Sequence, residues 1–282
     1  MDKKILAFVD GSQYSASVCD YAAWAADRLG ANVELIHVLG RREKATSELS
    51  GTIALGARSS LMADLANLDA QQAKLSSHRG RAILEDASAR VRGDGHTAPS
   101  TQLRNGDIVE AVAERGADAR LMVIGKRGEG HEAAQDHLGS NMERLIRATT
   151  SPVLVANGTF HPVNKVCLAY DGGTSAIKAL KTLASSPIFK DIDVTLVTVG
   201  GDAHVLERLN DAQALLSDAG INAQHENLTG EPDVALADFV EARGFDMVVM
   251  GAYGHSRIRS LIIGSTTTAM IRSCKVPVLL MR

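Results

Sequence analysis

Short apolar runs alternate with amphipathic stretches along this chain. Residues 4–9 form an apolar run that ends in a polar turn at residues 10–12, and apolar positions at helical spacing follow over about residues 15–29. A second apolar run covers residues 33–38. Strand, helix and strand at this spacing form a βαβ unit, so the pattern predicts a parallel sheet.

The next segment, residues 40–96, has a different pattern. Its first part is polar and has no clear period, whereas leucines recur at helical intervals from about residue 59 onward. We predict a loop followed by a long helix, with Gly80 as a candidate break. Two interpretations of this helix stay open: it binds a partner, or it is an ordinary amphipathic helix that covers the sheet.

Beyond this segment, helices and strands alternate again. The pattern predicts a helix over residues 107–115, a strand over 121–124, a helix over 141–147 and a strand over 152–156. The strand and helix order is that of a parallel α/β fold.

The same order of elements then begins a second time, so the chain contains an internal duplication. Asp10 and Asp171 are 161 positions apart, whereas Gly125 and Gly251 are 126 apart, so the first copy carries 35 more residues. We expect two domains, residues 1–157 and residues 158–282, with most of the extra residues in segment 40–96. The matching segments are 4–11 with 165–172, the second strand with 194–199, 125–140 with 251–265, and 152–155 with 277–280.

Composition and charge exclude several classes of protein. Of the 282 residues 45% are hydrophobic, 22% charged and 4% aromatic, and the net charge is −3. This balance argues against a nucleic acid or acidic membrane partner. No apolar run reaches the roughly 18 residues of a membrane span, and the first residues do not resemble a signal peptide, so we expect a cytoplasmic protein. Cys19, Cys167 and Cys274 lie among apolar neighbours and are expected to be reduced core thiols.

A glycine pattern near the end of the chain is typical of phosphate binding. The apolar run 247–250 leads into Gly251 and Gly254, and Gly264 follows, directly before a hydroxyl run. Glycines allow sharp turns and close approach of the backbone to a ligand, and a helix N-terminus attracts anions. The alternative is that these glycines only make turns. Neither a Walker A motif nor a Gly-x-Gly-x-x-Gly motif after a strand is present.

Two aspartates, Asp10 and Asp171, each end the first strand of their copy. Ligands of parallel α/β sheets bind at the carboxyl ends of the strands, so these carboxylates are candidates for contacts to a ribose or to a phosphate-bound metal ion. The alternative is an N-cap of the following helix, since Asp-Gly-Ser is also good capping and turn chemistry. The same placement in both copies favours ligand contact.

The loop after the second glycine carries opposite charges in the two copies. In the second copy, residues 255–263 hold two arginines and one histidine and no acid. In the first copy, residues 129–138 hold three acids and neither lysine nor arginine, which Lys126 and Arg127 partly offset. Because phosphate oxygens favour basic surroundings, we predict that the second copy holds the better phosphate site.

Other polar residues are interpreted as structural. His131, Asp136 and His137 are conceivable metal ligands, but the sequence lacks a cysteine cluster or an i,i+4 histidine pair, so we expect polar loop residues and no metal site. His37 lies within an apolar strand and is interpreted as a hydrogen-bonded core histidine. No catalytic triad or carboxylate pair can be placed in one site, and no catalytic residue is nominated.

The duplication and the glycine pattern together resemble a tandem universal stress protein, with two such domains in one chain. The motif Gly-x2-Gly-x9-Gly-Ser/Thr of the ATP-binding branch is met by Gly251, Gly254, Gly264 and Ser265. The resemblance implies an α/β fold: two doubly wound, five-stranded parallel sheets of strand order 3-2-1-4-5, with helices on both faces. It also implies that the last strands, 152–156 and 276–281, pair with each other around a pseudo-two-fold axis.

The resemblance further implies a nucleotide site at matching positions of each copy. In the second copy these positions are Ala169, Tyr170, Asp171, Val199, Met250, Gly251, Gly254, Gly264, Ser265 and Thr266. In the first copy, which is expected to be the weaker second site, they are Phe8, Val9, Asp10, Val38, Ile124, Gly125, Gly128, Gly139, Ser140 and Asn141.

The leading hypothesis is therefore a nucleotide-binding regulatory protein of the cytoplasmic stress response. It would bind ATP or AMP, with Mg²⁺ when a triphosphate is held, and would hydrolyse ATP slowly or not at all. One alternative is a scaffold without nucleotide binding that engages a protein or an apolar ligand through segment 40–96. Another is an enzyme of adenylyl or pyrophosphate chemistry, for which no acceptor site is evident in the sequence. Association into a homodimer is left open.

Overall fold

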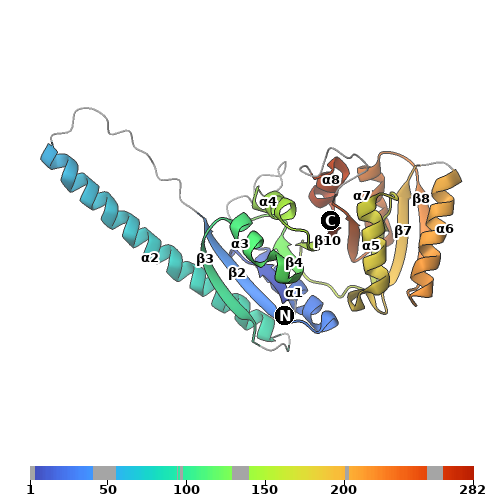
Figure 1. Ribbon diagram of the computed structural model, residues 1–282, viewed down its shortest axis with the longest axis horizontal. Coiled ribbons are helices and arrows are strands. Elements are labelled where there is room, and N and C mark those ends of the chain that lie inside the picture. The colour runs from blue at the N-terminus through green and yellow to red at the C-terminus, as the bar shows by residue number, and fades with distance from the viewer. Residues whose placement is uncertain are drawn as a thin grey trace.

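The computed structural model describes residues 4–40, 55–93, 95, 98–128, 140–200, 203–252 and 263–282. Within these residues, ten strands form one continuous sheet of order β3-β2-β1-β4-β5-β10-β9-β6-β7-β8 (Figure 1). The first five strands are β1 (Lys4–Phe8), β2 (Val33–Gly40), β3 (Ser100–Gly106), β4 (Ala119–Gly125) and β5 (Val153–Ala156). The other five are β6 (Lys165–Ala169), β7 (Asp193–Val199), β8 (Ala223–Leu228), β9 (Met247–Gly251) and β10 (Val278–Met281).

Each half of this sheet confirms the expected strand order. All neighbours within a half pair in parallel, in the order 3-2-1-4-5 when the strands of each half are counted along the chain. The halves meet through an antiparallel pair of their last strands, in which Val278 lies opposite Val155 and Leu280 opposite Val153. This pairing, which the family resemblance implied, covers an apolar edge that each half would otherwise expose.

Helices cover both faces of the sheet. Apolar side chains alternate between the faces along each strand: Ile5 and Ala7 belong to one core cluster, and Leu6 and Phe8 to the other. The first cluster is covered by α1 (Ser15–Leu29), α2 (Leu55–Gly93), α5 (Thr174–Ser185) and α6 (Ala203–Asp218). The second is covered by α3 (Ile108–Arg115), α4 (Ser140–Ala148), α7 (Pro232–Arg243) and α8 (Ser265–Ser273). Short 3-10 helices lie at Gly116–Asp118 and Pro187–Phe189.

Helix α2 is continuous over 39 residues, so the candidate break at Gly80 is wrong. A Cβ atom on Gly80 would lie 2.6 Å from Leu103 Cδ1 and 2.8 Å from His37 Cδ2. The glycine therefore lets the helix pack closely on β2 and β3 and does not interrupt it. His37 is buried and its Nδ1 lies 2.7 Å from the carbonyl oxygen of Val9, which confirms the core interpretation.

Polar contacts also join the two halves at the β5–β10 pair. Asn157 Nδ2 donates to the carbonyl oxygen of Cys274 at 2.7 Å, and Lys126 Nζ donates to the same oxygen at 3.0 Å. Across the pair, Arg282 Nη1 donates to the carbonyl oxygens of Arg147 and Thr149. Donors from each half thus satisfy carbonyls at the C-terminal end of a helix in the other, where cations are favoured.

Two further expectations concern cysteines and membranes. Cys19, Cys167 and Cys274 are buried free thiols, as expected. Burial raises the pKa of the Cys274 thiol to about 11, so this side chain stays a neutral thiol at neutral pH. Within the part of the chain that the structure describes, no helix combines the length and the apolar character that a membrane crossing requires.

Candidate functional site

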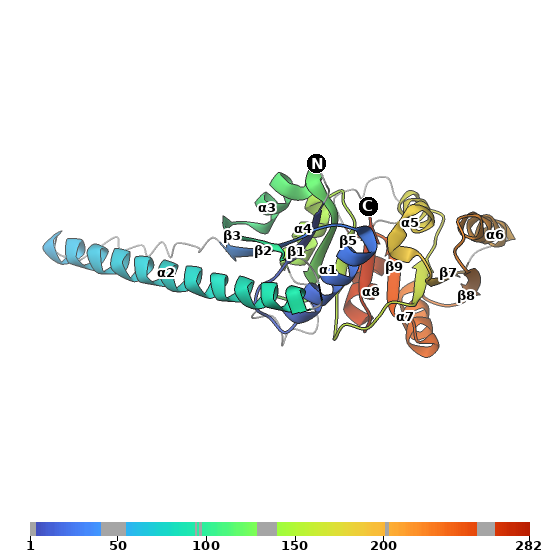
Figure 2. The ribbon, with the colours of Figure 1, turned by 90° about the horizontal axis from the view of Figure 1, so that it is seen from below.

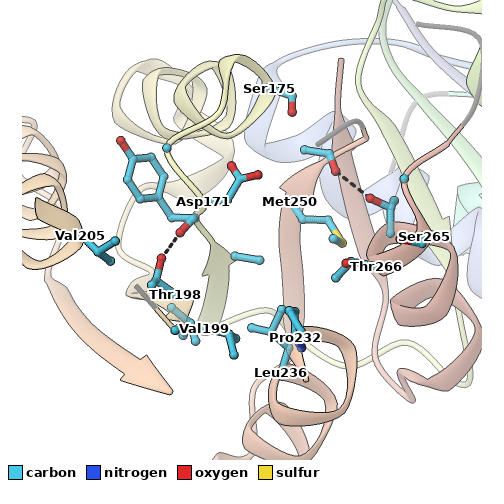
Figure 3. Close-up of a pocket in the computed structure, with 18 of the residues that line it drawn as sticks. Asp171, Ser175, Thr198, Val199, Val205, Pro232, Leu236, Met250, Ser265 and Thr266 are labelled. Atoms are coloured by element: carbon cyan, nitrogen blue, oxygen red, sulfur yellow. Dashed lines mark hydrogen bonds between the residues drawn. The ribbon is translucent and has the colours of Figure 1, made fainter. Parts of the chain in front are cut away.

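A cavity of about 460 Å³ lies at the carboxyl ends of β6, β7 and β9, next to the N-terminus of α8 (Figure 3). This is the edge at which parallel α/β sheets bind ligands. Nine of the ten positions expected in the second copy line it, and the tenth, Gly254, lies outside the described residues. The nine are Ala169, Tyr170, Asp171, Val199, Met250, Gly251, Gly264, Ser265 and Thr266.

The turn from β6 into α5 places Asp171 at the cavity. Its Oδ1 accepts a hydrogen bond from the backbone N–H of Gly173 at 2.8 Å, and Gly172 between them adopts a left-handed φ of 74°. Gly173, and not Asp171, is the N-cap of α5, so the N-cap interpretation is wrong, and the Asp171 carboxylate instead stabilises the turn before the helix. Figure 3 shows the carboxylate between the α6 side of the cavity, at Val205, and the α8 side, at Ser265.

The corresponding turn of the first half is built in the same way. Asp10 Oδ1 accepts from the backbone N–H of Ser12 at 3.0 Å and from the hydroxyl of Ser15 at 3.3 Å. The N-cap of α1 is Tyr14. In both halves, therefore, Oδ1 of the aspartate accepts a hydrogen bond within the strand–helix turn, and the aspartate also lines the cavity.

Gly251 has a packing role that the sequence analysis did not foresee. A Cβ atom on Gly251 would lie 2.1 Å from Ser175 Oγ and 2.8 Å from Ser175 Cβ. Its counterpart Gly125 stands in the same relation to Tyr14, whose Cβ would be 2.7 Å away. Neither glycine is among the described residues with positive φ. The last residue of the fourth strand is thus glycine because the helix that follows the first strand of its half, α1 or α5, starts against it, rather than because the backbone turns there.

The start of α8 presents backbone N–H groups to the cavity. Gly264 is the N-cap, with φ −58° and ψ 145°, and its own N–H donates to the carbonyl oxygen of Ala252 at 3.2 Å. The N–H groups of the first turn, at Ser265, Thr266 and Thr267, have no acceptor one turn earlier in the helix. The first turn contains no acidic residue. The cavity therefore borders the positive end of a helix, an arrangement that suits an anion.

The opposite part of the cavity is apolar. Val199, Leu236 and Met250 form this wall together with Val205 and Pro232 (Figure 3). Beside it, the hydroxyl of Thr198 donates to the carbonyl oxygen of Tyr170 and so fixes β6 against β7. Burial raises the pKa of the Tyr170 phenol, which keeps it in the neutral form at neutral pH. A ligand with a flat apolar part and an anionic part would match this division of the cavity.

Arg208 is a site residue that the sequence analysis missed. It lies on α6 and lines the cavity, and its Nη1 lies 3.2 Å from the point where a Cβ atom of Gly172 would be. Val205, one helical turn earlier, lines the cavity too. The signal available in the sequence was an arginine three residues after an apolar position, at the start of the helix that follows the second strand. Among the described residues that line the cavity, Asp171 is the sole carboxylate.

The first half holds a smaller cavity, of about 330 Å³, at the equivalent edge. Gly139 lies outside the described residues, and Ser140 is described only as the first residue of α4. Arg127 lines this cavity, whereas Lys126 is buried at the junction of the halves and contributes nothing to it. The expected positions that line it are Phe8, Val9, Asp10, Val38, Ile124, Gly125, Gly128 and Asn141.

Charged groups in this smaller cavity are partly paired with each other. Arg144 Nη1 lies 2.5 Å from Asp107 Oδ2, and both residues line the cavity. Asp107 also caps α3, since its Oδ1 accepts from the backbone N–H of Val109 at 2.7 Å. A Cβ atom on Gly128 would lie 3.0 Å from Asp10 Oδ2, so the chain passes close to that carboxylate. An anion entering here meets the carboxylate of Asp10, the guanidinium of Arg144, which is already paired, and the guanidinium of Arg127.

Metal ligation finds no support in the described part of the chain. No group of three or more His, Cys, Asp or Glu side chains that could hold a metal ion occurs there. The three residues considered as ligands, His131, Asp136 and His137, lie outside the described residues.

Comparison with known proteins gives consistent matches over the whole chain. The model of the universal stress protein family matches residues 1–157 and 200–282. A universal stress protein of Synechocystis sp. is 36% identical over 286 residues, which covers 99% of this chain and 100% of that protein. A second universal stress protein, from Mycolicibacterium smegmatis, is 21% identical over 297 residues, covering 99% of this chain and 96% of the relative.

Solved structures agree with the fold. The crystal structure of a universal stress protein from Archaeoglobus fulgidus superimposes with a TM-score of 0.74 at 19% identity, covering 100% of this chain and 99% of that one. Because the superposition covers both chains almost completely, the two structures share the arrangement of the halves as well as the fold of each half. With the family match and the full-length relative, this shows that the chain belongs to the universal stress protein family.

Proposed function

We propose that this universal stress protein binds an adenine nucleotide, ATP or AMP, in the cavity of its second half. In this proposal it acts in the cytoplasm as a nucleotide-dependent regulator of the stress response. The observation that carries the proposal is the meeting of nine separately expected residues around one cavity of about 460 Å³. This volume falls within the range of small-molecule sites, roughly 300–1,000 Å³.

Each part of the cavity suits one part of the nucleotide. The base would pack against the apolar wall at Val199, Leu236 and Met250. The ribose hydroxyls would lie near the carboxylate of Asp171, whose oxygens accept hydrogen bonds from hydroxyl groups. The phosphates would meet the first-turn N–H groups of α8, where the helix dipole favours negative charge.

Arg208 adds a positive charge on the α6 side. A guanidinium forms strong hydrogen bonds to phosphate oxygens, so Arg208 would favour the more highly charged nucleotide, ATP, over AMP. Because Arg208 is solvent-exposed, its contribution would depend on ionic strength.

Mg²⁺ would enter with a triphosphate and not on its own. Asp171 is the one carboxylate among the described lining residues, and Mg²⁺ is commonly held by one or two carboxylates together with substrate phosphates. The same side chain already accepts a hydrogen bond from Gly173, and the described lining residues offer no second carboxylate or histidine as a general base. We therefore expect slow hydrolysis of ATP at most.

The test is titration calorimetry of the full chain with ATP and with AMP, beside a Gly264→Phe variant. Gly264 has a backbone conformation that any residue adopts, so the variant changes the cavity without straining the backbone. The proposal expects binding to the wild type and at least a tenfold loss in the variant. Unchanged affinity in the variant would reject this cavity. No binding of either nucleotide to the wild type would favour the scaffold alternative instead.

A further inference from the structure

Arg208 lies beside the turn that holds Asp171. Its Nη1 lies 3.2 Å from the point where a Cβ atom of Gly172 would be, and Gly172 directly follows Asp171 in the turn from β6 into α5. Figure 3 shows Val205, one turn before Arg208 on α6, and Ser265 of α8 on opposite sides of Asp171. The cavity therefore offers positive charge at two places, the N-terminus of α8 and Arg208, with a carboxylate between them.

The first half has an apolar side chain at the equivalent place. Helix α2 packs on β2 and β3 as α6 packs on β7 and β8, toward the two outer ends of the sheet (Figure 2). Ile83 Cδ1 would lie 2.9 Å from a Cβ atom of Gly11, the counterpart of Gly172. The buried core residues of the two helices keep one register of 125 positions, which also relates Ile83 to Arg208: Leu84, Ala87 and Val91 correspond to Leu209, Ala212 and Leu216.

Packing alone does not require an arginine at the position of Arg208. An apolar side chain covers the turn in the first half, and Arg208 is exposed, so its charge adds little to the stability of the fold. A guanidinium at the border of a cavity can instead donate parallel hydrogen bonds to an anionic ligand.

The charge of Arg208 is also felt inside this end of the cavity, at the phenol of Tyr170. Burial is the largest cause of the raised pKa of this phenol, and Arg208 opposes it. Two carboxylates act in the other direction, Asp171 at the cavity and Asp211 on the exposed side of α6, but each has a smaller effect on the pKa than Arg208. The carboxylates alone therefore do not set the potential at this end.

Asp171 and Arg208 together match a ribose that carries one phosphoryl group. A carboxylate accepts a hydrogen bond from a free hydroxyl, and a guanidinium donates to phosphoryl oxygens. In parallel sheets that bind dinucleotides, an acidic side chain contacts a ribose hydroxyl, or a nearby arginine accommodates a phosphate group on that ribose. In this protein both kinds of side chain line one cavity.

We propose that this cavity prefers an adenosine bisphosphate, a nucleotide with one phosphoryl group on the 5′-oxygen and a second on a ribose hydroxyl. The 5′-phosphoryl group would meet the N–H groups at the start of α8, and the second phosphoryl group would meet Arg208. The remaining ribose hydroxyl would donate to Asp171. The inference rests on the nucleotide site proposed above, and it specifies where on the nucleotide the second phosphoryl group lies.

Titration calorimetry of the full chain tests this preference with AMP, ADP and the two bisphosphate isomers of ADP, adenosine 2′,5′-bisphosphate and adenosine 3′,5′-bisphosphate. ADP carries the same number of phosphoryl groups as the bisphosphates, but both lie on the 5′ side. We expect one of the bisphosphates to bind about tenfold more tightly than ADP. The isomer that does so identifies the hydroxyl that carries the second phosphoryl group.

Arg208→Ala separates a direct contact from attraction at a distance. The affinity for the preferred bisphosphate should fall about 100-fold, because charge-assisted hydrogen bonds are lost, and the affinity for ADP should fall about tenfold at most. Lys181→Ala is the control, because Lys181 is an exposed cation of the second half that is not among the described lining residues. It should change each affinity less than twofold, and urea unfolding checks that both variants keep the wild-type fold.

Two results would overturn this inference and leave the proposed nucleotide site intact. One is that both bisphosphates bind the wild type no more tightly than ADP. The other is that Arg208→Ala weakens the bisphosphate and ADP by the same factor, which would make Arg208 a general attractor of anions. If none of the four nucleotides binds the wild type, the proposed function fails together with this inference.

Discussion

The two halves of this protein have the same strand order and a cavity at the same edge, yet they line that cavity differently. In the second half, α6 begins three residues after Gly200 and brings Val205 and Arg208 to the cavity. In the first half, α2 begins only at Leu55, and none of its residues is among the lining residues described. The shared strands place a cavity at the same edge of both halves, and the helix after the second strand contributes side chains to its lining in the second half.

Packing constraints, by contrast, are repeated in both halves. Gly125 and Gly251 each allow a helix to start against the end of the fourth strand. The side chain that meets the glycine differs: it is Tyr14 in the first half and Ser175 in the second, and both line their cavities. The larger side chain accompanies the smaller cavity, about 330 Å³ against 460 Å³. The duplication therefore preserves the core contacts and varies the groups that line the cavity.

The largest expected effect comes from filling each cavity in turn. Thr266→Trp fills the second cavity at the start of α8, and Asn141→Trp is the matched change at the start of α4. We expect the affinity for ATP to fall about 100-fold, or about 2.7 kcal/mol, in Thr266→Trp, and less than twofold in Asn141→Trp. Titration calorimetry measures both. The reverse order of effects would place the main site in the first half.

The next largest effect concerns a contact that occurs once in each half, between the glycine at the end of the fourth strand and the start of a helix. Gly251→Ala and Gly125→Ala each add a Cβ atom closer than 3 Å to a neighbouring side chain, so each should lower the free energy of unfolding by about 1–3 kcal/mol. Gly116→Ala is the control, because its nearest neighbour would be 3.4 Å away. Urea unfolding measures all three variants. If only one of the two strand-end variants is destabilised, the packing role is not a common feature of the halves.

A smaller effect is expected from Arg208. Arg208→Ala should weaken ATP binding about tenfold, because it removes an exposed charge beside the cavity. Arg144→Ala, its control in the first half, should change ATP affinity less than twofold, since Arg144 is paired with Asp107. The loss in Arg208→Ala should shrink at high salt. An Arg208→Ala variant with wild-type affinity would show that α6 does not distinguish the two cavities.

The smallest effect tests the junction, where Lys126 of the first half corresponds to Ala252 of the second. Burial lowers the pKa of Lys126 from its usual value of 10.5. Between the lowered pKa and 10.5, the unfolded chain binds a proton that the folded chain has released, so the stability contributed by Lys126 rises with pH across this window. Below this pH window Lys126 is charged in the folded and the unfolded chain, so the cost of burying the charge lowers the stability by its full amount.

Lys126→Met removes this dependence. Asn157 still donates to the carbonyl oxygen of Cys274 in the variant, so the junction keeps a hydrogen bond there. We expect the free energy of unfolding of the wild type to increase relative to Lys126→Met between about pH 7 and about pH 10, in urea unfolding at several pH values. A difference that is constant or falls with pH would contradict the account of a buried, depressed lysine.

The sequence predicted most of the central strands and the grouping of the site, because both depend on local patterns. Apolar runs such as residues 247–250 are buried on both faces and stand out from their surroundings. The glycines, the aspartate and the helix start of the candidate site come together because the strands of a parallel sheet end at one edge. The apolar pattern of the sequence did not predict β3 (Ser100–Gly106). This strand lies at the edge of the sheet and is half exposed, so its residues are largely polar.

Other features depend on contacts between distant residues and could not be predicted. Gly80 looks like a break in a helical pattern, and only the approach of Leu103 and His37 explains it. Gly251 resembles a turn residue, and only the position of Ser175 reveals its packing role. Arg208 carries no motif, and its relevance depends on how α6 crosses the end of the sheet.

The most direct test of the central claim is a crystal structure of the full chain grown with excess ATP. The account predicts one nucleotide per chain in the second half, with its base against Val199 and Met250 and its phosphates within hydrogen-bond distance of the backbone N–H groups of Ser265 and Thr266. Nucleotide density beside Asn141 in the first half, with the second cavity closed by side chains, would contradict it.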